Sequence, residues 1–119
     1  MDRIDLSRDG VNWDEDLRLV YRGELFTGEV VETVAGQLLS QSFYVNGIPD
    51  GPDREWWAEG GLKSEGQMKG GRAVGTFRSW HSNGQLESQE EFDNSGELLS
   101  RQKWDKDGNS IPLKRRRVI

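Results

Sequence analysis

The stretch Gly75-Thr-Phe-Arg-Ser-Trp80-His-Ser-Asn-Gly84-Gln-Leu86-Glu-Ser88-Gln-Glu-Glu-Phe92 decides the fold, because parts of it return every 24 residues along the chain. The recurring residues are Gly36, Gly60, Gly84 and Gly108; Leu38, Leu62 and Leu86; Ser40, Ser64 and Ser88; Trp56, Trp80 and Trp104; and Tyr44, Met68 and Phe92. A fixed period of this length is typical of a repeat protein whose units stack on one another.

Each unit is predicted to be a β-hairpin. In the clearest unit, strands at 76–81 and 85–92 are joined by Ser82-Asn83-Gly84. A three-residue hairpin loop needs a left-handed residue at its last position, where glycine fits without a Cβ penalty. This geometry sets His81 opposite Gln85, so Trp80 is expected to face Leu86.

The same register predicts which side chains share a face of the sheet. Arg78 is expected to face Ser88, and in the preceding unit Trp56 should face Leu62 and Arg54 should face Ser64. Because side chains alternate along a strand, one face is expected to be apolar and the other mostly polar. The predicted apolar face carries Trp80, Leu86, Ser88, Glu90 and Phe92; the predicted polar face carries Phe77, Ser79, His81, Gln85, Glu87, Gln89 and Glu91. The sequence therefore predicts an all-β protein, a single curled antiparallel sheet of repeated hairpins.

The chain is short enough to be one domain, residues 1–119. Residues 1–16 do not match the repeat, 17–111 carry it, and 112–119 form a basic tail. Short strands are expected near 4–6, 11–13 and 17–21. The first full unit, 28–50, is one residue short and places Glu32 at the tryptophan position, as expected for an atypical unit near the end of a stack. Pro112 is expected to end strand pairing.

The composition is polar, with 33% hydrophobic residues and a mean hydropathy of −0.83. The chain has no cysteine, so disulfides and thiolate chemistry are excluded. No run approaches the roughly 20 apolar residues of a membrane-spanning helix, and the first residues lack the apolar segment of a secretory signal. A cytoplasmic protein without a membrane segment is the expectation.

The charge is unevenly distributed along the chain. The net charge is −5, and the tail Lys114-Arg-Arg-Arg117 holds four of the sixteen positive charges, so residues 1–113 carry −9. An acidic body repels phosphate backbones, which argues against nucleic-acid binding, and attracts a basic protein partner. Solubility alone is an equally good reason for the acidity. The tail is expected to be a solvated or edge-protecting segment, with contact to anionic lipid as the alternative.

The sequence offers little for catalysis. His81 is the only histidine, and it is expected to be a surface residue because no second histidine or cysteine exists for a zinc site. The glycine pairs at 60–61 and 70–71 belong to turns, and no helix follows that could hold a phosphate. We expect no enzyme activity, no cofactor and no metal.

The repeated unit, Gly-x-x-x-x-Trp-x-x-x-Gly-x-Leu-x-Ser followed by Tyr, Met or Phe, resembles the bacterial variant of the MORN repeat. The order Tyr21-Arg-Gly23 to Gly28, followed by Tyr44-Val-Asn-Gly47-Ile-Pro-Asp-Gly51, is similar to that of YwqK-type antitoxin proteins. The resemblance covers residues 17–111. It implies an antitoxin or immunity protein that binds and neutralises a toxin, whereas ordinary MORN arrays imply a scaffold or a contact with phospholipid.

The residues proposed to bind a partner form two acidic groups. The first is Asp14-Glu15-Asp16, for which a solvated turn is the alternative, and the second is Trp57 with Asp53 and Glu55 on its strand. Exposed aromatic residues are frequent interface anchors. Three hypotheses follow: an inhibitory module that docks on a basic toxin, a scaffold or membrane-associated protein, and a homo-oligomer that closes over the Trp/Leu/Phe face. The oligomeric state is left open.

Overall fold

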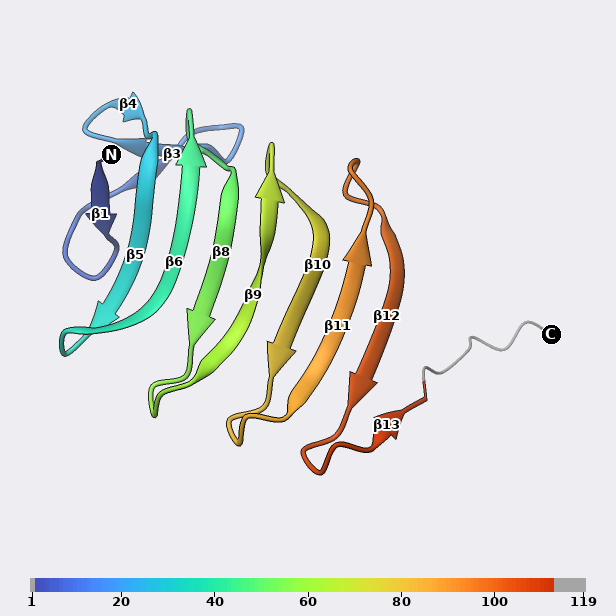
Figure 1. The fold of residues 1–119 in the computed structure, drawn as a ribbon. Coiled ribbons are helices and arrows are strands. Elements are labelled where there is room, and N and C mark those ends of the chain that lie inside the picture. Colours follow the sequence, from blue (N-terminus) through green and yellow to red (C-terminus); the bar gives the residue numbers. More distant parts are fainter. Residues whose placement is uncertain (1, 113–119) are drawn as a thin grey trace.

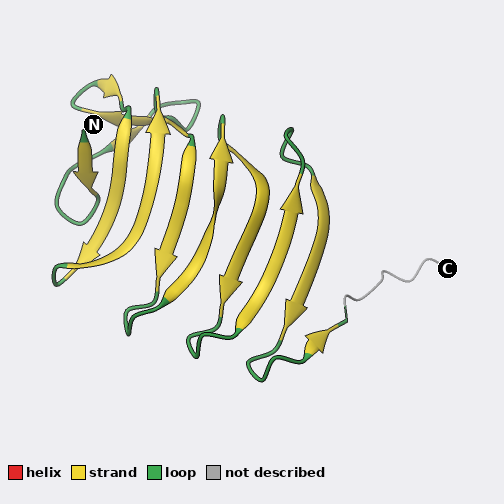
Figure 2. Ribbon diagram, viewed as in Figure 1, coloured by secondary structure: helices red, strands yellow, loops and turns green. Residues whose placement is uncertain are grey.

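The computed structural model describes residues 2–112, which form thirteen strands and no helix (Figures 1 and 2). The strands are β1 (Arg3–Asp5), β2 (Asn12–Trp13), β3 (Leu19–Tyr21), β4 (Glu24–Leu25), β5 (Gly28–Val34), β6 (Gln37–Val45), β7 (Ile48–Pro49), β8 (Gly51–Trp56), β9 (Leu62–Lys69), β10 (Arg72–Trp80), β11 (Leu86–Phe92), β12 (Leu98–Trp104) and β13 (Ser110–Ile111). The predicted all-β fold is confirmed.

Ten of these strands form one open, twisted sheet in the order β1-β5-β6-β8-β9-β10-β11-β12-β13, with β7 paired to β6 (Figure 1). Neighbouring strands are antiparallel except β1, which runs parallel to β5. Strands β2, β3 and β4 form a second, small sheet. The main sheet of consecutive hairpins agrees with the sequence-based expectation, whereas the parallel strand and the second sheet were not predicted.

The three-residue loop is present as predicted. His81 N–H donates to Gln85 O at 2.8 Å, and Gly84 N–H donates to His81 O at 2.9 Å. Gly84 has a φ of 89°, in the left-handed region that favours glycine. Trp80 pairs with Leu86, and in the preceding unit Trp56 pairs with Leu62, so this part of the register is confirmed.

One residue further along, the register differs from the prediction. Ser88 pairs with Ser79, and Arg78 pairs with Gln89, because Glu87 is an extra residue in a β-bulge. The same bulge recurs in the second unit, where Arg54 pairs with Glu65 rather than Ser64, with Lys63 as the extra residue, and in the first unit, with Leu39 as the extra residue. The predicted pairs Arg78–Ser88 and Arg54–Ser64 are therefore wrong.

The bulge changes which side chains share a face. The hydroxyls of Ser79 and Ser88 lie 2.6 Å apart, and the rings of Phe77 and Phe92 meet edge to face with centroids 5.8 Å apart. Since Trp80 follows Ser79 directly, it lies on the opposite face. The predicted single apolar face is wrong, because the bulge sends the serine and phenylalanine positions to one side and the tryptophans to the other.

The tryptophan face carries Trp56, Leu62, Trp80, Leu86 and Trp104, and the serine face carries Ser64, Ser79, Ser88, Phe77 and Phe92. Each face therefore has an apolar row of its own, and the serine face is not the mostly polar surface that alternation alone predicts.

The first unit is short because its loop is short. Ala35 and Gly36 form a two-residue turn with φ values of 52° and 79°, closed by the pair Val34–Gln37. Thr33 consequently pairs with Leu38, in the position that tryptophan occupies in later units. The placement of Glu32 at the tryptophan position is wrong, since Glu32 pairs with Ser40.

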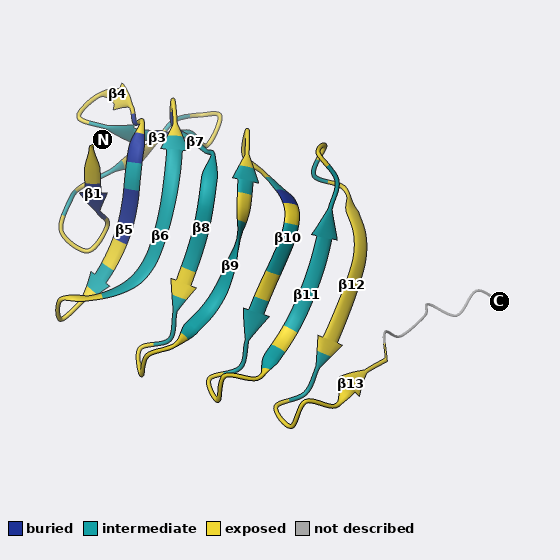
Figure 3. Cartoon of the chain, in the orientation of Figure 1, coloured by how far each residue is buried: buried dark blue, intermediate teal, exposed yellow. Residues whose placement is uncertain are grey.

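The best-buried core lies at the N-terminal end (Figure 3). Ile4, Leu19, Phe26 and Val30 form one buried cluster, and Tyr44 packs against it. The small sheet and β1 thus cover the first hairpin. Strand β12 is exposed along most of its length. Strand β13 ends at Ile111, directly before Pro112, and residues 113–119 of the basic tail lie outside the described residues.

Candidate functional site

The acidic loop at 14–18 lies between β2 and β3, and Asp14 holds it in shape. Its Oδ1 accepts the backbone N–H groups of Asp16 and Arg18 at 2.9 and 2.8 Å, and its Oδ2 accepts Arg18 Nε at 2.7 Å. The hydrogen bonds from Arg18 lower the pKa of Asp14 from its usual range. Glu15 and Asp16 remain exposed, and the Asp16 side chain is 78% accessible.

Two other loops have the same geometry. Asp93 accepts the backbone N–H groups of Ser95 and Glu97, and Asp105 accepts those of Asp107 and Asn109. In those loops the fourth residue is a left-handed glycine, Gly96 or Gly108, each with a φ of 87°. In the acidic loop that position is occupied by Leu17.

Leu17 is the most unusual residue of the loop. It has a φ of 62°, and 79% of its surface is accessible. A β-carbon in the left-handed region costs roughly 1–2 kcal/mol, and an exposed leucine gains nothing from burial. Strain held at an exposed apolar residue is a reason to suspect function. Sequence reasoning missed this residue. A comparison of the three loops reveals it, because Leu17 stands where the loops that begin at Asp93 and Asp105 have glycine.

The surroundings of Leu17 are also suited to contact. Trp13, on β2, is 53% accessible. A groove of about 470 Å³ runs between the acidic loop and the turns that follow β6 and β9. Its lining residues are Asp16, Leu17, Arg18, Gly47, Ile48, Pro49, Gly70 and Gly71. The acidic loop therefore combines charge, exposed apolar surface and a concave neighbour.

The second predicted group lies elsewhere and is engaged within the sheet. Asp53 accepts a hydrogen bond from the Ser42 hydroxyl at 2.6 Å, and Glu55 pairs with Lys63 at 3.8 Å. The Lys63 ammonium also lies 4.9 Å from the centre of a Trp57 ring. Trp57 is half-buried, and its Nε1 donates to Trp80 O at 3.2 Å.

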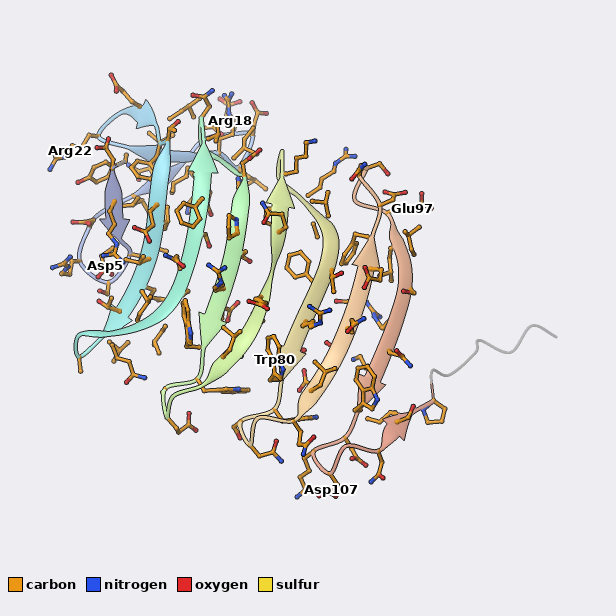
Figure 4. The ribbon with its side chains drawn as sticks, viewed as in Figure 1. Asp5, Arg18, Arg22, Trp80, Glu97 and Asp107 are labelled. Carbon is orange, nitrogen blue, oxygen red and sulfur yellow. The ribbon has the colours of Figure 1, made fainter. Side chains whose placement is uncertain are left out.

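The structure does not bring the two predicted groups together. The groove beside the acidic loop includes Gly71, just before β10 begins, whereas Trp57 binds Trp80 at the other end of β10. Figure 4 shows the same separation, with Arg18 near the upper ends of the strands and Trp80 near their lower ends. Asp14, Glu15 and Asp16 are thus a site of their own.

His81 repeats the role of Trp57. The two residues are 24 positions apart, and His81 Nε2 lies 2.9 Å from Trp104 O, as Trp57 Nε1 lies near Trp80 O. Asn83 and Gln37 add bonds from one hairpin end to the next, to Lys106 O and Ala58 O. These contacts tie neighbouring hairpins together, a repeated role that sequence reasoning missed.

The serine face also places a hydroxyl, a carboxylate and an imidazole close together. Ser79 Oγ donates to Glu87 Oε1 at 3.2 Å, and His81 Nδ1 lies 3.5 Å from Glu87 Oε2. In a nucleophilic triad the imidazole stands between the hydroxyl and the carboxylate. Here the carboxylate stands between them, so this arrangement does not pass the serine proton to His81.

Within residues 2–112, no group of three or more histidine, aspartate or glutamate side chains could hold a metal ion. The same part of the chain contains no helix long and apolar enough to cross a bilayer.

The comparisons with known proteins agree with the hairpin at residues 75–92. Residues 73–94 match the model of the MORN repeat variant. This range runs from β10 through the loop at Gly84 to the end of β11, which is one complete MORN hairpin. No curated protein and no solved structure matches the chain. The resemblance to MORN repeats is thus supported for the third unit.

Proposed function

We propose that the chain is a non-catalytic protein-binding module of the antitoxin or immunity type, which neutralises a basic partner by covering it. The observation that carries the proposal is Leu17, an exposed and strained leucine set among Asp14, Glu15 and Asp16. Protein interfaces place an apolar core inside a polar, solvent-accessible rim, and Leu17 among these carboxylates has that arrangement.

The charge distribution supports a basic partner. Residues 2–50 contain ten acidic and four basic residues, so this segment has a net charge of −6. Complementary charge speeds association and disfavours acidic competitors. The acidic loop projects from this end, where Glu15 and Asp16 face solvent. The partner class proposed is therefore a basic toxin, as the resemblance to antitoxin proteins implies.

The experiment mixes the purified chain with a basic toxin encoded beside it and measures the complex by calorimetry and light scattering. A complex with micromolar or tighter affinity is expected. Charge reversal of Glu15 and Asp16 to lysine should weaken it about tenfold or more. Leu17→Gly should weaken it similarly, while the fold becomes no less stable because glycine suits a positive φ.

A matched control separates the effect of the acidic loop on binding from the effect of net charge. Glu59→Lys with Asp107→Lys makes the same charge change on two exposed loops, β8–β9 and β12–β13, at the opposite ends of the strands. This double variant should bind nearly as well as the unmodified chain. The absence of a complex at micromolar concentration, or an equal loss in the control, would count against the proposal.

The match to the MORN repeat variant favours a second candidate, a scaffold that associates with anionic phospholipid. Co-sedimentation with vesicles containing anionic lipid tests it, using the chain with and without residues 114–119. Vesicle binding that requires those residues, without any toxin complex, would support the second candidate over the first.

A further inference from the structure

The tryptophan face carries a regular row of indoles. Trp56, Trp80 and Trp104 end the strands β8, β10 and β12, and Leu62 and Leu86 begin the strands between them. The pairs Trp56–Leu62 and Trp80–Leu86 place leucine and tryptophan on the same side. The row therefore runs across the strands, with one indole at every second strand.

The spacing of this row matches a particular ligand conformation. Neighbouring strands lie about 4.8 Å apart, so the indoles recur at about 9.6 Å. A polyproline II helix has three residues per turn and rises about 3.1 Å per residue, so it repeats at about 9.3 Å. Every third residue of such a segment, laid across the strands, would meet the next indole.

The indole N–H groups of this row have no partner within residues 2–112. Trp57, outside the row, donates its N–H to Trp80 O, whereas Trp56, Trp80 and Trp104 do not donate to any described atom. None of these groups is a buried unsatisfied atom within that range, so each is open to an incoming acceptor. A polyproline II segment has no internal hydrogen bonds, and its carbonyls can accept from such donors.

A cleft lies between the ends of the second and third hairpins. Its volume is about 240 Å³, and Leu62 and Trp80 of the tryptophan face line it together with Trp57, Gly61, His81, Ser82 and Gly84. Apolar and aromatic walls of this kind are typical of grooves that hold proline side chains. The tryptophan face thus has an aromatic surface and, beside Trp80, a cleft that can hold a proline ring.

One cation beside the row has no carboxylate partner within residues 2–112. A lane of polar side chains crosses the same face, in which Arg54 pairs with Glu65 at 3.7 Å. Arg78 is exposed and donates to Gln89 at 3.1 Å, and within residues 2–112 no carboxylate forms an ion pair with it. Arg78 is therefore available to a carboxylate from outside, although residues 1–113 as a whole carry −9.

We propose that the tryptophan face binds a proline-rich segment of a partner protein in the polyproline II conformation, with an acidic residue beside Arg78. The face of a sheet offers no backbone ladder to an extended strand, which favours a ligand whose backbone does not need one. This site is separate from the acidic loop, so it stands or falls independently of the proposed toxin complex.

The test titrates the isotopically labelled chain with a synthetic peptide of four Pro-Pro-Glu triplets and follows the five indole N–H signals by NMR. The signals of Trp56, Trp80 and Trp104 should move together, while that of Trp13, on the small sheet, should stay in place. A matched peptide of Pro-Pro-Lys triplets should bind at least about fivefold more weakly.

Two variants sharpen the test. Trp80→Phe keeps an aromatic ring and removes one donor, so affinity for the acidic peptide should fall about 2- to 10-fold, as expected for one hydrogen bond. Arg78→Gln, at an exposed position, should produce a similar fall even if the tryptophan variant folds poorly. Trp13→Phe is the control and should bind normally.

Three results would overturn the proposal. The first is no movement of the three signals at about 2 mM peptide, a ceiling that corresponds to very weak binding. The second is equal binding of the lysine peptide. The third is movement of the same signals on raising protein concentration alone, which would make the row a contact between two copies of this chain.

Discussion

At the scale of single residues, three aspartates set the shape of three loops. Asp14, Asp93 and Asp105 each accept two backbone N–H groups from the residues two and four positions ahead. Such side chain–backbone bonds favour tight turns over extended pairing. The loops therefore depend on ionised carboxylates, so their contribution to the free energy of unfolding should depend on pH.

The pKa of Asp93 is lowered by the hydrogen bond from the Ser95 hydroxyl and then by the backbone of Glu97. A lowered folded-state pKa stabilises the fold above the unfolded-state value of about 4, and this contribution is lost as the pH falls through the folded-state value. Asp93→Asn should lower the free energy of unfolding at pH 7, and the difference from the unmodified chain should shrink below about pH 4.

Urea unfolding followed by tryptophan fluorescence at several pH values measures this difference. Asp107→Asn is the control, because the Asp107 carboxylate accepts no hydrogen bond from the described residues. A pH-independent difference for Asp93→Asn would show that its charge does not hold the loop.

Gly66 lies beneath the ring of Phe77, and a β-carbon built at this position would overlap that ring. Gly66→Ala should therefore destabilise the protein by roughly 1–3 kcal/mol, as overpacking does. Gly10→Ala, where a β-carbon meets no atom within 4 Å, should change the free energy of unfolding by less than about 0.5 kcal/mol. Equal effects of the two substitutions would contradict the close packing of Phe77 on Gly66.

At the scale of the hairpin, the repeated β-bulge decides which face each side chain occupies. Its extra residues are Leu39, Lys63 and Glu87, which have no chemical type in common. The sequence predicted the loop and the Trp80–Leu86 pair because Gly84 has a backbone requirement that only glycine meets easily. The sequence could not predict the bulge, because the alternation of side chains along the strand continues through Glu87 and no residue type marks the extra position.

Deletion of Glu87 tests the bulge. Removal of this extra residue makes Trp80–Leu86 and Ser79–Ser88 consecutive pairs of a regular ladder, so Phe92 should stay beside Phe77. Ring-to-ring NOE contacts between Phe77 and Phe92 measure this in the deletion variant. Glu87→Ala, which removes only the contacts with Ser79 and His81, is the control and should cost less than about 1 kcal/mol by urea unfolding. A deletion variant in which Phe92 leaves Phe77 and joins the tryptophan face would contradict the bulged register.

At the scale of the whole molecule, the two ends of the sheet differ. The N-terminal end holds the buried cluster around Leu19 and the acidic loop, whereas β12 at the other end is exposed along most of its length. The repeat period predicted the stacked hairpins between these ends. It gave no information on the parallel pairing of β1 or on the small sheet, because residues before 17 lie outside the repeat and their partners are distant in sequence.

The candidate site was predicted only in part for the same reason. Charge alone indicated Asp14, Glu15 and Asp16, and whether they bind a partner stays a prediction. Leu17 stands out only when its loop is compared with those at Gly96 and Gly108. Trp57 was chosen as an exposed anchor, but a bond to the next hairpin is a long-range contact that no local pattern reveals.

A set of NOE contacts across the main sheet distinguishes two apolar rows on opposite faces from a single apolar face. We expect contacts between the β-protons of Ser79 and Ser88 and between the rings of Phe77 and Phe92, with the indole of Trp80 near neither pair. Contacts that join Trp80 to Ser88 or Phe92 would mean that one apolar face exists after all, and would contradict the bulged repeat on which the two faces depend.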